Sequence, residues 1–252
     1  MTANPIMFQL PSFATVSGFV HGFSEVADGN MAFTWGTAEV VVENRRRFLN
    51  TLGVPFERCV VMHIEHGTTV AVVGEDDAGR GMEDAETAVR ADALVTTTSG
   101  LALFLLTADC LPIIFYDPVR RAVGLAHVSR LNATSGLVAK IVGAMVARGC
   151  TVKDLIVGIG PAIHKESYIF PDDASHAWMP RFGRHAHMVG GGATAIDLIG
   201  YAVDEFVKSG VPVSSIAASE VDVGADPRFF SHRRSEVNGE PEGRMATVAG
   251  LR

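Results

Sequence analysis

The sequence predicts an α+β fold, in which strands and helices are mixed irregularly along the chain. Short apolar segments bounded by turn residues are typical of buried strands, whereas two longer segments carry apolar residues at helical spacing. The predicted strands cover 93–96, 101–106, 111–116 and 122–126, and their separators are Ser99-Gly100, Asp109-Cys110 and Asp117-Pro118.

Two helices are expected in the second half of the chain. Apolar residues three and four positions apart predict a helix over 137–146, which ends at Arg148-Gly149. A second helix is expected over about 195–208, with Asp197 in its first turn. Because the first helix begins a few residues after His127, its free amide donors are expected to face an anion bound nearby.

Two β-rich pieces lie upstream, over 59–64 and 68–73, and they flank the pair His66-Gly67. His66 is therefore expected at a turn between two strands. The acidic, glycine-containing segment 74–84 that follows predicts a surface loop.

The composition indicates one globular domain over residues 1–252. Apolar residues make up 48% of the chain and charged residues 19%, which is enough for a full hydrophobic core. No linker, low-complexity tract or internal repeat divides the chain. A membrane span is not expected, because Asp109 interrupts the most apolar segment and a span needs about eighteen apolar residues.

The net charge indicates the class of partner, and the cysteine content indicates the cellular compartment. A net charge of −7 without a basic run argues against nucleic acid as the main partner and favours a small molecule. Cys59, Cys110 and Cys150 are widely spaced and odd in number, which is typical of free thiols in a reducing compartment. The N-terminal residues lack the pattern of a secretory signal. We therefore expect a cytoplasmic protein, as a monomer or small homo-oligomer.

Three residues with metal-binding or catalytic chemistry stand at predicted turns or strand ends. They are His66, Cys110 and His127. Two imidazoles and one thiol are the parts of a three-ligand metal site with an open position. They are equally the parts of a thiol nucleophile, Cys110, with His127 as its base. Asp109 is expected either to orient a ligand or to cap the turn.

Several ordered motifs resemble the laccase-domain family, also called YfiH-like or multicopper polyphenol oxidase, which is associated with purine nucleoside phosphorylase activity. The motifs span nearly the whole chain: His21-Gly-Phe-Ser24, Glu43-Asn-Arg-Arg46, His66-Gly67, Ala91-Asp-Ala-Leu-Val-Thr96, Thr107-Ala-Asp-Cys-Leu-Pro112, Gly160-Pro-Ala-Ile163, and Phe230-Ser-His-Arg-Arg234 with Gly243-Arg244. The resemblance implies a single α+β domain with a central β-sandwich of mixed sheets flanked by helices, as in cytotoxic necrotizing factor. It also implies zinc ligands at His66, Cys110 and His127.

The segment after His127 departs from the family pattern. The family usually reads His-Ala-Gly-Trp-Arg-Gly, whereas this chain reads His127-Val-Ser-Arg-Leu-Asn132. Leu131 thus stands where the family has arginine, and leucine cannot bind phosphate as a guanidinium does. The remaining candidates to bind an anionic substrate are Arg45, Arg130 and Arg233.

The resemblance implies a zinc-dependent purine nucleoside phosphorylase acting on adenosine, inosine or 5′-methylthioadenosine, with adenosine deamination as a side activity. Catalytic roles would fall on Cys110, His127 and His66, and phosphate would be the second substrate. Two alternatives stay open: a Cys-His thiol hydrolase or amidase, and a nucleoside-binding relative that has lost its chemistry. Copper is a less favoured metal than zinc, and an oxidase is not expected, since the nine histidines are scattered rather than clustered in pairs.

Overall fold

Two mixed β-sheets lie face to face at the centre of this computed structural model, which describes residues 7–14, 16–171 and 177–252. One sheet has the strand order β1-β14-β6-β2-β4, and the other has the order β13-β9-β7-β8-β5-β3. The first comprises β1 (Phe19–Phe23), β14 (Met245–Leu251), β6 (Ala102–Thr107), β2 (Cys59–His63) and β4 (Val89–Arg90). The second comprises β13 (Ile216–Ala218), β9 (Ile156–Ile159), β7 (Leu111–Asp117), β8 (Ala122–Val128), β5 (Ala93–Thr96) and β3 (Val70–Val72). Both sheets combine parallel and antiparallel neighbours.

The central strands are buried on both faces, which explains their continuous apolar sequence. In β7, Ile114 and Tyr116 point into the core between the two sheets, whereas Ile113 and Phe115 point to the opposite face. Successive side chains of a strand alternate between faces, so a strand covered on both sides needs apolar residues throughout.

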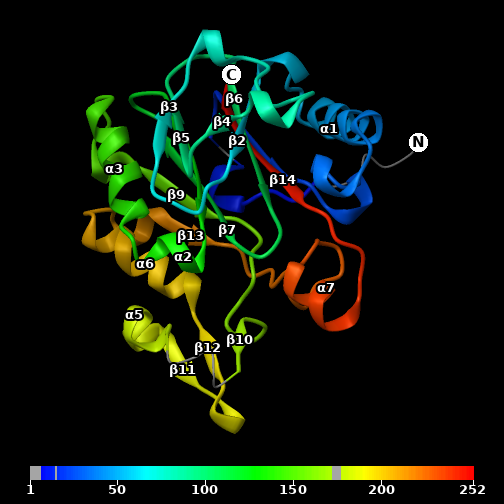
Figure 1. Cartoon of the computed structure of the whole chain (residues 1–252). Helices are drawn as coiled ribbons and strands as arrows, with labels where there is room; N and C mark the ends of the chain where they lie inside the picture. The colour runs from blue at the N-terminus through cyan, green and yellow to red at the C-terminus, as the bar shows by residue number, and fades with distance from the viewer. Residues whose placement is uncertain (1–6, 15, 172–176) are drawn as a thin grey trace.

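Helices cover the outer faces of the sandwich (Figure 1). On the five-stranded sheet lies α1 (Ala38–Leu52), which buries Phe48, Leu49 and Leu52. The six-stranded sheet is covered by α3 (Leu137–Ala147) and α6 (Leu198–Lys208), which share one hydrophobic core with it. The layers therefore run helix, sheet, sheet, helix.

Smaller elements surround one end of the sandwich. A short sheet of β10 (Ile169–Phe170), β12 (Thr194–Ile196) and β11 (Ala186–Met188) extends from it with α5 (Met179–Phe182), as Figure 1 shows. The helix α2 (Arg130–Ala133) follows β8, and α7 (His232–Asn238) precedes β14. Across the described ranges, no helix combines the length and apolarity that crossing a membrane requires.

The predicted α+β class and the sandwich implied by the family resemblance are confirmed. The four predicted strands correspond to β5 to β8, and the helix over 137–146 is α3. The second helix begins at Leu198 rather than at about 195. Residues Thr194–Ile196 pair within the short sheet, and Asp197 is the N-cap, whose Oδ1 accepts a hydrogen bond from Gly200 N at 2.8 Å.

His21, in the N-terminal motif, has a structural role in the core. It is 2% exposed, its ring packs against Phe13 and Phe19, and its Nε2 accepts a hydrogen bond from the Leu10 backbone N–H at 2.9 Å. Burial lowers the pKa of His21 to about 4, because the interior disfavours the charged ring.

We therefore expect the free energy of unfolding to fall as the pH drops from about 6.5 towards 4. In that window the unfolded chain binds a proton at His21 that the folded protein does not bind, which amounts to at most about 3 kcal/mol. Urea unfolding at about pH 7 and about pH 4.5 measures the effect. His21→Gln does not titrate, so it should lose less stability between these pH values than the wild type; equal losses would contradict the assignment.

Candidate functional site

A cavity of about 520 Å³ lies where β6 and β8 end. Residues distant in sequence line it: Thr107 from β6, His127 from β8, His66 from the β2–β3 connection, and side chains of α7. Three of the lining residues have buried polar atoms that find no hydrogen-bond partner among the described residues, namely Thr107 Oγ1, His127 Nδ1 and Arg130 Nε. Such atoms are rare in folded proteins and identify this cavity as the candidate site for a polar ligand.

Asp92 fixes the loop that carries His66. This fully buried carboxylate accepts hydrogen bonds from the backbone N–H groups of Glu65 (3.2 Å) and Thr69 (3.3 Å), and its own backbone oxygen accepts one from His127 N at 2.9 Å. Between the two anchored amides, His66 adopts a positive φ of 56°, a conformation uncommon for residues other than glycine. Through these hydrogen bonds Asp92 fixes the backbone on both sides of His66 and also the backbone of His127.

His66 and His127 lie next to each other, as the sequence predicted. Their ring centroids are 5.1 Å apart and their planes are nearly perpendicular, at 88°. His66 is exposed, whereas His127 is 3% exposed. Burial, with a smaller effect of His66, lowers the pKa of His127 to about 3, so its ring is neutral at neutral pH.

Cys110 lines the same cavity and is half-buried. Burial, with a further contribution from Asp109, raises the pKa of its thiol to about 12. Among the described residues, no hydrogen bond joins its Sγ to either imidazole. A thiol in this environment stays protonated, which weighs against Cys110 acting as a nucleophile without a metal.

The chemistry of the three predicted ligands fits zinc, since two imidazoles and one thiolate form a known type of open zinc site. His127 Nδ1 has no hydrogen-bond partner among the described residues, so it can act as a metal ligand. Nevertheless, within the described part of the chain no three His, Cys, Asp or Glu side chains are close enough to hold a metal ion. A bound ion would have to draw His66, Cys110 and His127 closer together.

Asp109 joins the Cys110 loop to the start of α7. Its Oδ1 accepts a hydrogen bond from Ser231 Oγ at 2.7 Å, and its Oδ2 accepts one from Arg233 N at 2.8 Å. The sequence predicts that Asp109 either orients a ligand or caps its turn. These contacts are those of a cap, but they cap the first turn of α7 and not the loop that contains Asp109. The link brings His232, Arg233 and Glu236 to the cavity wall beside Cys110.

Two of the three predicted arginines reach the cavity. The Arg130 guanidinium lies between the rings of Phe170 and Trp178, 4.8 and 4.5 Å from their centroids, and its Nη1 donates to Tyr168 Oη at 3.2 Å. Arg233 lies 4.8 Å from the Phe170 centroid on the same wall. Neither guanidinium forms an ion pair with a carboxylate of the described residues, so both are available to an anion.

Arg45 does not belong to the site, which corrects the sequence-based expectation. It is 1% exposed and belongs to the buried face of α1, where it donates hydrogen bonds to the backbone oxygens of Met31, Gly81 and Met82. These carbonyl groups satisfy the buried guanidinium. The arginine therefore ties the 74–84 loop to the helix and is out of reach of a ligand in the cavity.

The expected anion site at the start of α3 is also wrong. The helix begins at Leu137 and contributes no residue to the cavity, because α2 intervenes. In α2, Ser129 and Asn132 form a reciprocal capping box, and the buried Asn132 Nδ2 donates to the His127 backbone oxygen at 3.0 Å. This rearranged loop places Arg130 in the cavity and leaves Leu131 partly exposed at its edge.

Sequence reasoning missed several residues of the site. His232, Glu236 and Arg244 line the cavity, but none of them is assigned a catalytic role from the sequence. Asp92 likewise stood in a quoted motif without a role. The available signal was the grouping of charged residues in the motifs at 230–234 and 243–244, far in sequence from the histidines.

The architecture and the cavity define a laccase-like β-sandwich with a His-His-Cys group at one end of its sheets. The chain belongs to the family described as multi-copper polyphenol oxidoreductase laccase, whose model matches residues 15–252. Purine nucleoside phosphorylase YlmD of Geobacillus stearothermophilus is 34% identical over 219 residues, covering 84% of this chain and 79% of the relative. Purine nucleoside phosphorylase SCO2081 of Streptomyces coelicolor is 33% identical over 204 residues, covering 81% of each.

Solved structures agree with this membership. The crystal structure of YlmD from Geobacillus stearothermophilus superposes with a TM-score of 0.87 at 31% identity, covering 98% of this chain and 99% of that one. The Bacillus licheniformis protein YfiH superposes with a TM-score of 0.84 at 26% identity, covering 93% of both chains. Homologues of this chain are thus named for purine nucleoside phosphorolysis.

We expect Asp92→Asn to destabilise the protein by about 1–3 kcal/mol, because an amide keeps one acceptor and turns a donor towards a backbone N–H. Amide hydrogen exchange at Glu65 and Thr69 should become faster, and activity should fall as His66 loses its fixed position. Asp117→Asn is the matched control: Asp117 is 1% exposed and accepts from two backbone N–H groups, but it is the last residue of β7 and binds the β7–β8 turn. Unchanged exchange at Glu65 and Thr69 in Asp92→Asn would refute the role of Asp92.

Proposed function

We propose that this protein is a purine nucleoside phosphorylase, in which phosphate attacks ribose C1′ as the bond to the purine breaks. The observation that carries the proposal is the Arg130 guanidinium on the cavity wall, stacked between two aromatic rings and without a carboxylate partner among the described residues. Phosphate requires such a donor, and Arg130 supplies it although Leu131 stands at the usual arginine position. The names of the relatives support the same reaction class.

The proposed roles follow from the position of each residue. Arg130 and Arg233 bind phosphate, since both guanidinium groups border the cavity on one wall. Apolar side chains from three other segments, Ile64, Leu106 and Leu131, offer the purine ring an apolar surface. His66, Cys110 and His127 form the polar centre of the same cavity.

We also propose a resident zinc ion held by His66, Cys110 and His127. A zinc ion with an open position would act as a Lewis acid on the group it touches. The raised pKa of the Cys110 thiol supports a ligand role over a free nucleophile, since coordination to a metal deprotonates a thiol that burial keeps neutral. Copper remains the less favoured metal.

Adenosine, inosine and 5′-methylthioadenosine are the proposed substrates, with adenosine deamination as a side activity. A single unit over residues 1–252, a monomer or small homo-oligomer, and a cytoplasmic location stay predictions from the sequence.

Product analysis of the purified protein tests the reaction. We expect each nucleoside to release its free base only when phosphate is present, and His127→Ala to abolish the release. Arg130→Gln should raise the KM for phosphate by about 10- to 100-fold, the range expected for a lost hydrogen bond to a charged group. Base release without phosphate would indicate a hydrolase, and no turnover at all would favour a binding protein.

Arg181→Gln is the matched control for Arg130. Arg181 also stacks on Trp178, with its guanidinium 5.2 Å from the ring centroid, but it does not line the cavity. An equal rise of the phosphate KM in both variants would mean that Arg130 acts only through the aromatic cluster.

Elemental analysis and thermal unfolding test the metal. We expect close to one zinc per chain and a lower Tm after treatment with a chelator, because a ligand bound only to the folded state stabilises it. His66→Ala and Cys110→Ser should bind zinc more weakly, and excess zinc should partly restore the activity of Cys110→Ser. The zinc proposal would be overturned if the protein contained no metal, were fully active and had the same Tm with and without the chelator.

A further inference from the structure

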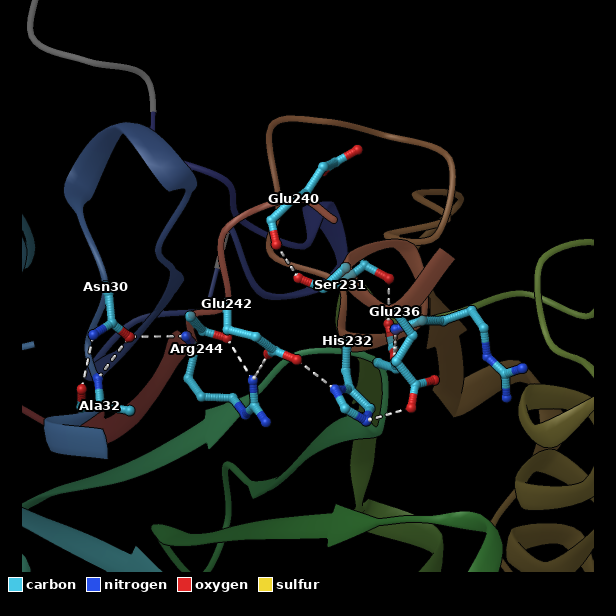
Figure 2. A network of polar contacts seen from close by, with 12 residues as sticks. Asn30, Ala32, Ser231, His232, Glu236, Glu240, Glu242 and Arg244 are labelled. Carbon is cyan, nitrogen blue, oxygen red and sulfur yellow. Dashed lines mark hydrogen bonds and ion pairs between the residues drawn. The ribbon is translucent and has the colours of Figure 1, made fainter. Parts of the chain in front are cut away.

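A second polar network borders the cavity on the side of α7, and the histidines and the cysteine discussed above do not belong to it. His232, the first residue of α7, lines the cavity together with Glu236 and Arg244 (Figure 2). The hydrogen bonds from Ser231 and Arg233 to Asp109 fix the start of this helix beside the Cys110 loop. The His232 ring therefore has a defined place on the cavity wall.

Glu242 fixes the orientation of that ring. The His232 Nδ1 lies 2.6 Å from Glu242 Oε1, and Arg244 Nη1 donates to Glu242 Oε2 at 2.9 Å. Burial acts to raise the pKa of Glu242, but its hydrogen bonds with His232 and Arg244 lower it overall. An ionised Glu242 accepts a hydrogen bond from Nδ1–H, so Glu242 binds one ring nitrogen and leaves Nε2 to other partners.

The other end of the network is anchored to the N-terminal part of the chain. The Arg244 guanidinium lies 3.9 Å from the Trp35 ring centroid, and its backbone N–H donates to Asn30 Oδ1 at 3.0 Å. Asn30 in turn makes two hydrogen bonds with the Ala32 backbone, which Figure 2 shows. Glu242 is thereby held between two partners and cannot easily turn away from His232.

The other ring nitrogen of His232, Nε2, lies beside Glu236, which also lines the cavity. It lies 3.4 Å from Glu236 Oε1, one turn further along α7, and both side chains are about half exposed. The charged groups around the ring are Glu236 and Arg233 on its own helix, Glu242 and Arg244 before β14, and Asp109 on the Cys110 loop. A carboxylate oxygen thus lies beside each ring nitrogen, from Glu242 at Nδ1 and from Glu236 at Nε2.

We infer that His232 is the general acid that protonates the leaving purine, with Glu242 as its positioning residue; this inference rests on the proposed phosphorylase function. As the C1′–N9 bond breaks, its electron pair passes to the purine, and a phosphate oxygen forms the new bond to C1′. The step starts from the imidazolium form of His232. The ring gives its Nε2 proton to purine N7, so the base leaves neutral and a neutral imidazole remains with its proton on Nδ1. The ring then regains a proton from water. Protonation by a positioned side chain contributes about 10²- to 10⁴-fold in rate.

The test compares inosine with 7-methylinosine, in wild type and in His232→Gln. The methylated purine already carries a positive charge, so it departs without receiving a proton. We expect His232→Gln to lower kcat/KM for inosine by about 100-fold or more and that for 7-methylinosine by less than about 5-fold. An equal loss with both substrates would overturn the inference, because a binding or structural role does not depend on the leaving group.

Glu242→Gln supplies a second, independent variant should His232→Gln fold poorly. It should also lower kcat/KM for inosine more than that for 7-methylinosine. Glu240→Gln is the matched control, because Glu240 is a neighbouring carboxylate that pairs with Arg234 and does not line the cavity. Its kcat/KM should match that of the wild type with both substrates, and a selective loss with inosine in Glu240→Gln would overturn the assignment.

The wild-type measurements separate this inference from the proposed function. If the wild type releases no base from either nucleoside with phosphate, the phosphorylase proposal fails. If the wild type cleaves inosine but not 7-methylinosine, the pH profile of kcat/KM tests the role of His232 instead. His232→Gln should lose the decline at high pH that deprotonation of the acid causes, and retention of that decline would overturn the role of His232.

Discussion

The packing of two sheets against each other is the constraint on which the rest of this structure depends. Each central strand is covered on both faces, by the other sheet on one side and by a helix layer on the other. That arrangement buries apolar side chains and fixes where each strand ends. The candidate site lies at one end of the sandwich, where β6 and β8 stop and polar groups meet the cavity.

Two aspartates connect this scaffold to the site. Asp92 accepts backbone N–H groups of the β2–β3 connection and so fixes His66, while Asp109 accepts groups from the start of α7. Both side chains position residues of the site, and this role does not require contact with a ligand. Each satisfies backbone donors that would otherwise be unpaired, and each thereby holds two segments distant in sequence at one wall of the cavity.

The loop after His127 shows how a departure from the family pattern is accommodated. Asn132 and Ser129 cap the short helix α2, and Asn132 also binds the His127 backbone. The guanidinium of Arg130 then enters the cavity between two aromatic rings, one position before the place where the family has arginine. The cavity thus contains a guanidinium although Leu131 stands at the family's arginine position.

The sequence by itself determined the strands β5 to β8, the helix α3 and the fold class, because side-chain periodicity and turn residues are local signals. The grouping of His66 with His127 rests on their residue types at predicted turns and strand ends and on the family resemblance. The sequence also identified Cys110 and two of the three cavity arginines. Tertiary structure alone decided the rest. Arg45 and Arg130 are indistinguishable as residue types, but one is enclosed by backbone carbonyls and the other faces a cavity. Likewise, His232 lines the same cavity as Cys110 and His127 because Ser231 and Arg233 bind Asp109, 122 and 124 positions away, which no local pattern encodes.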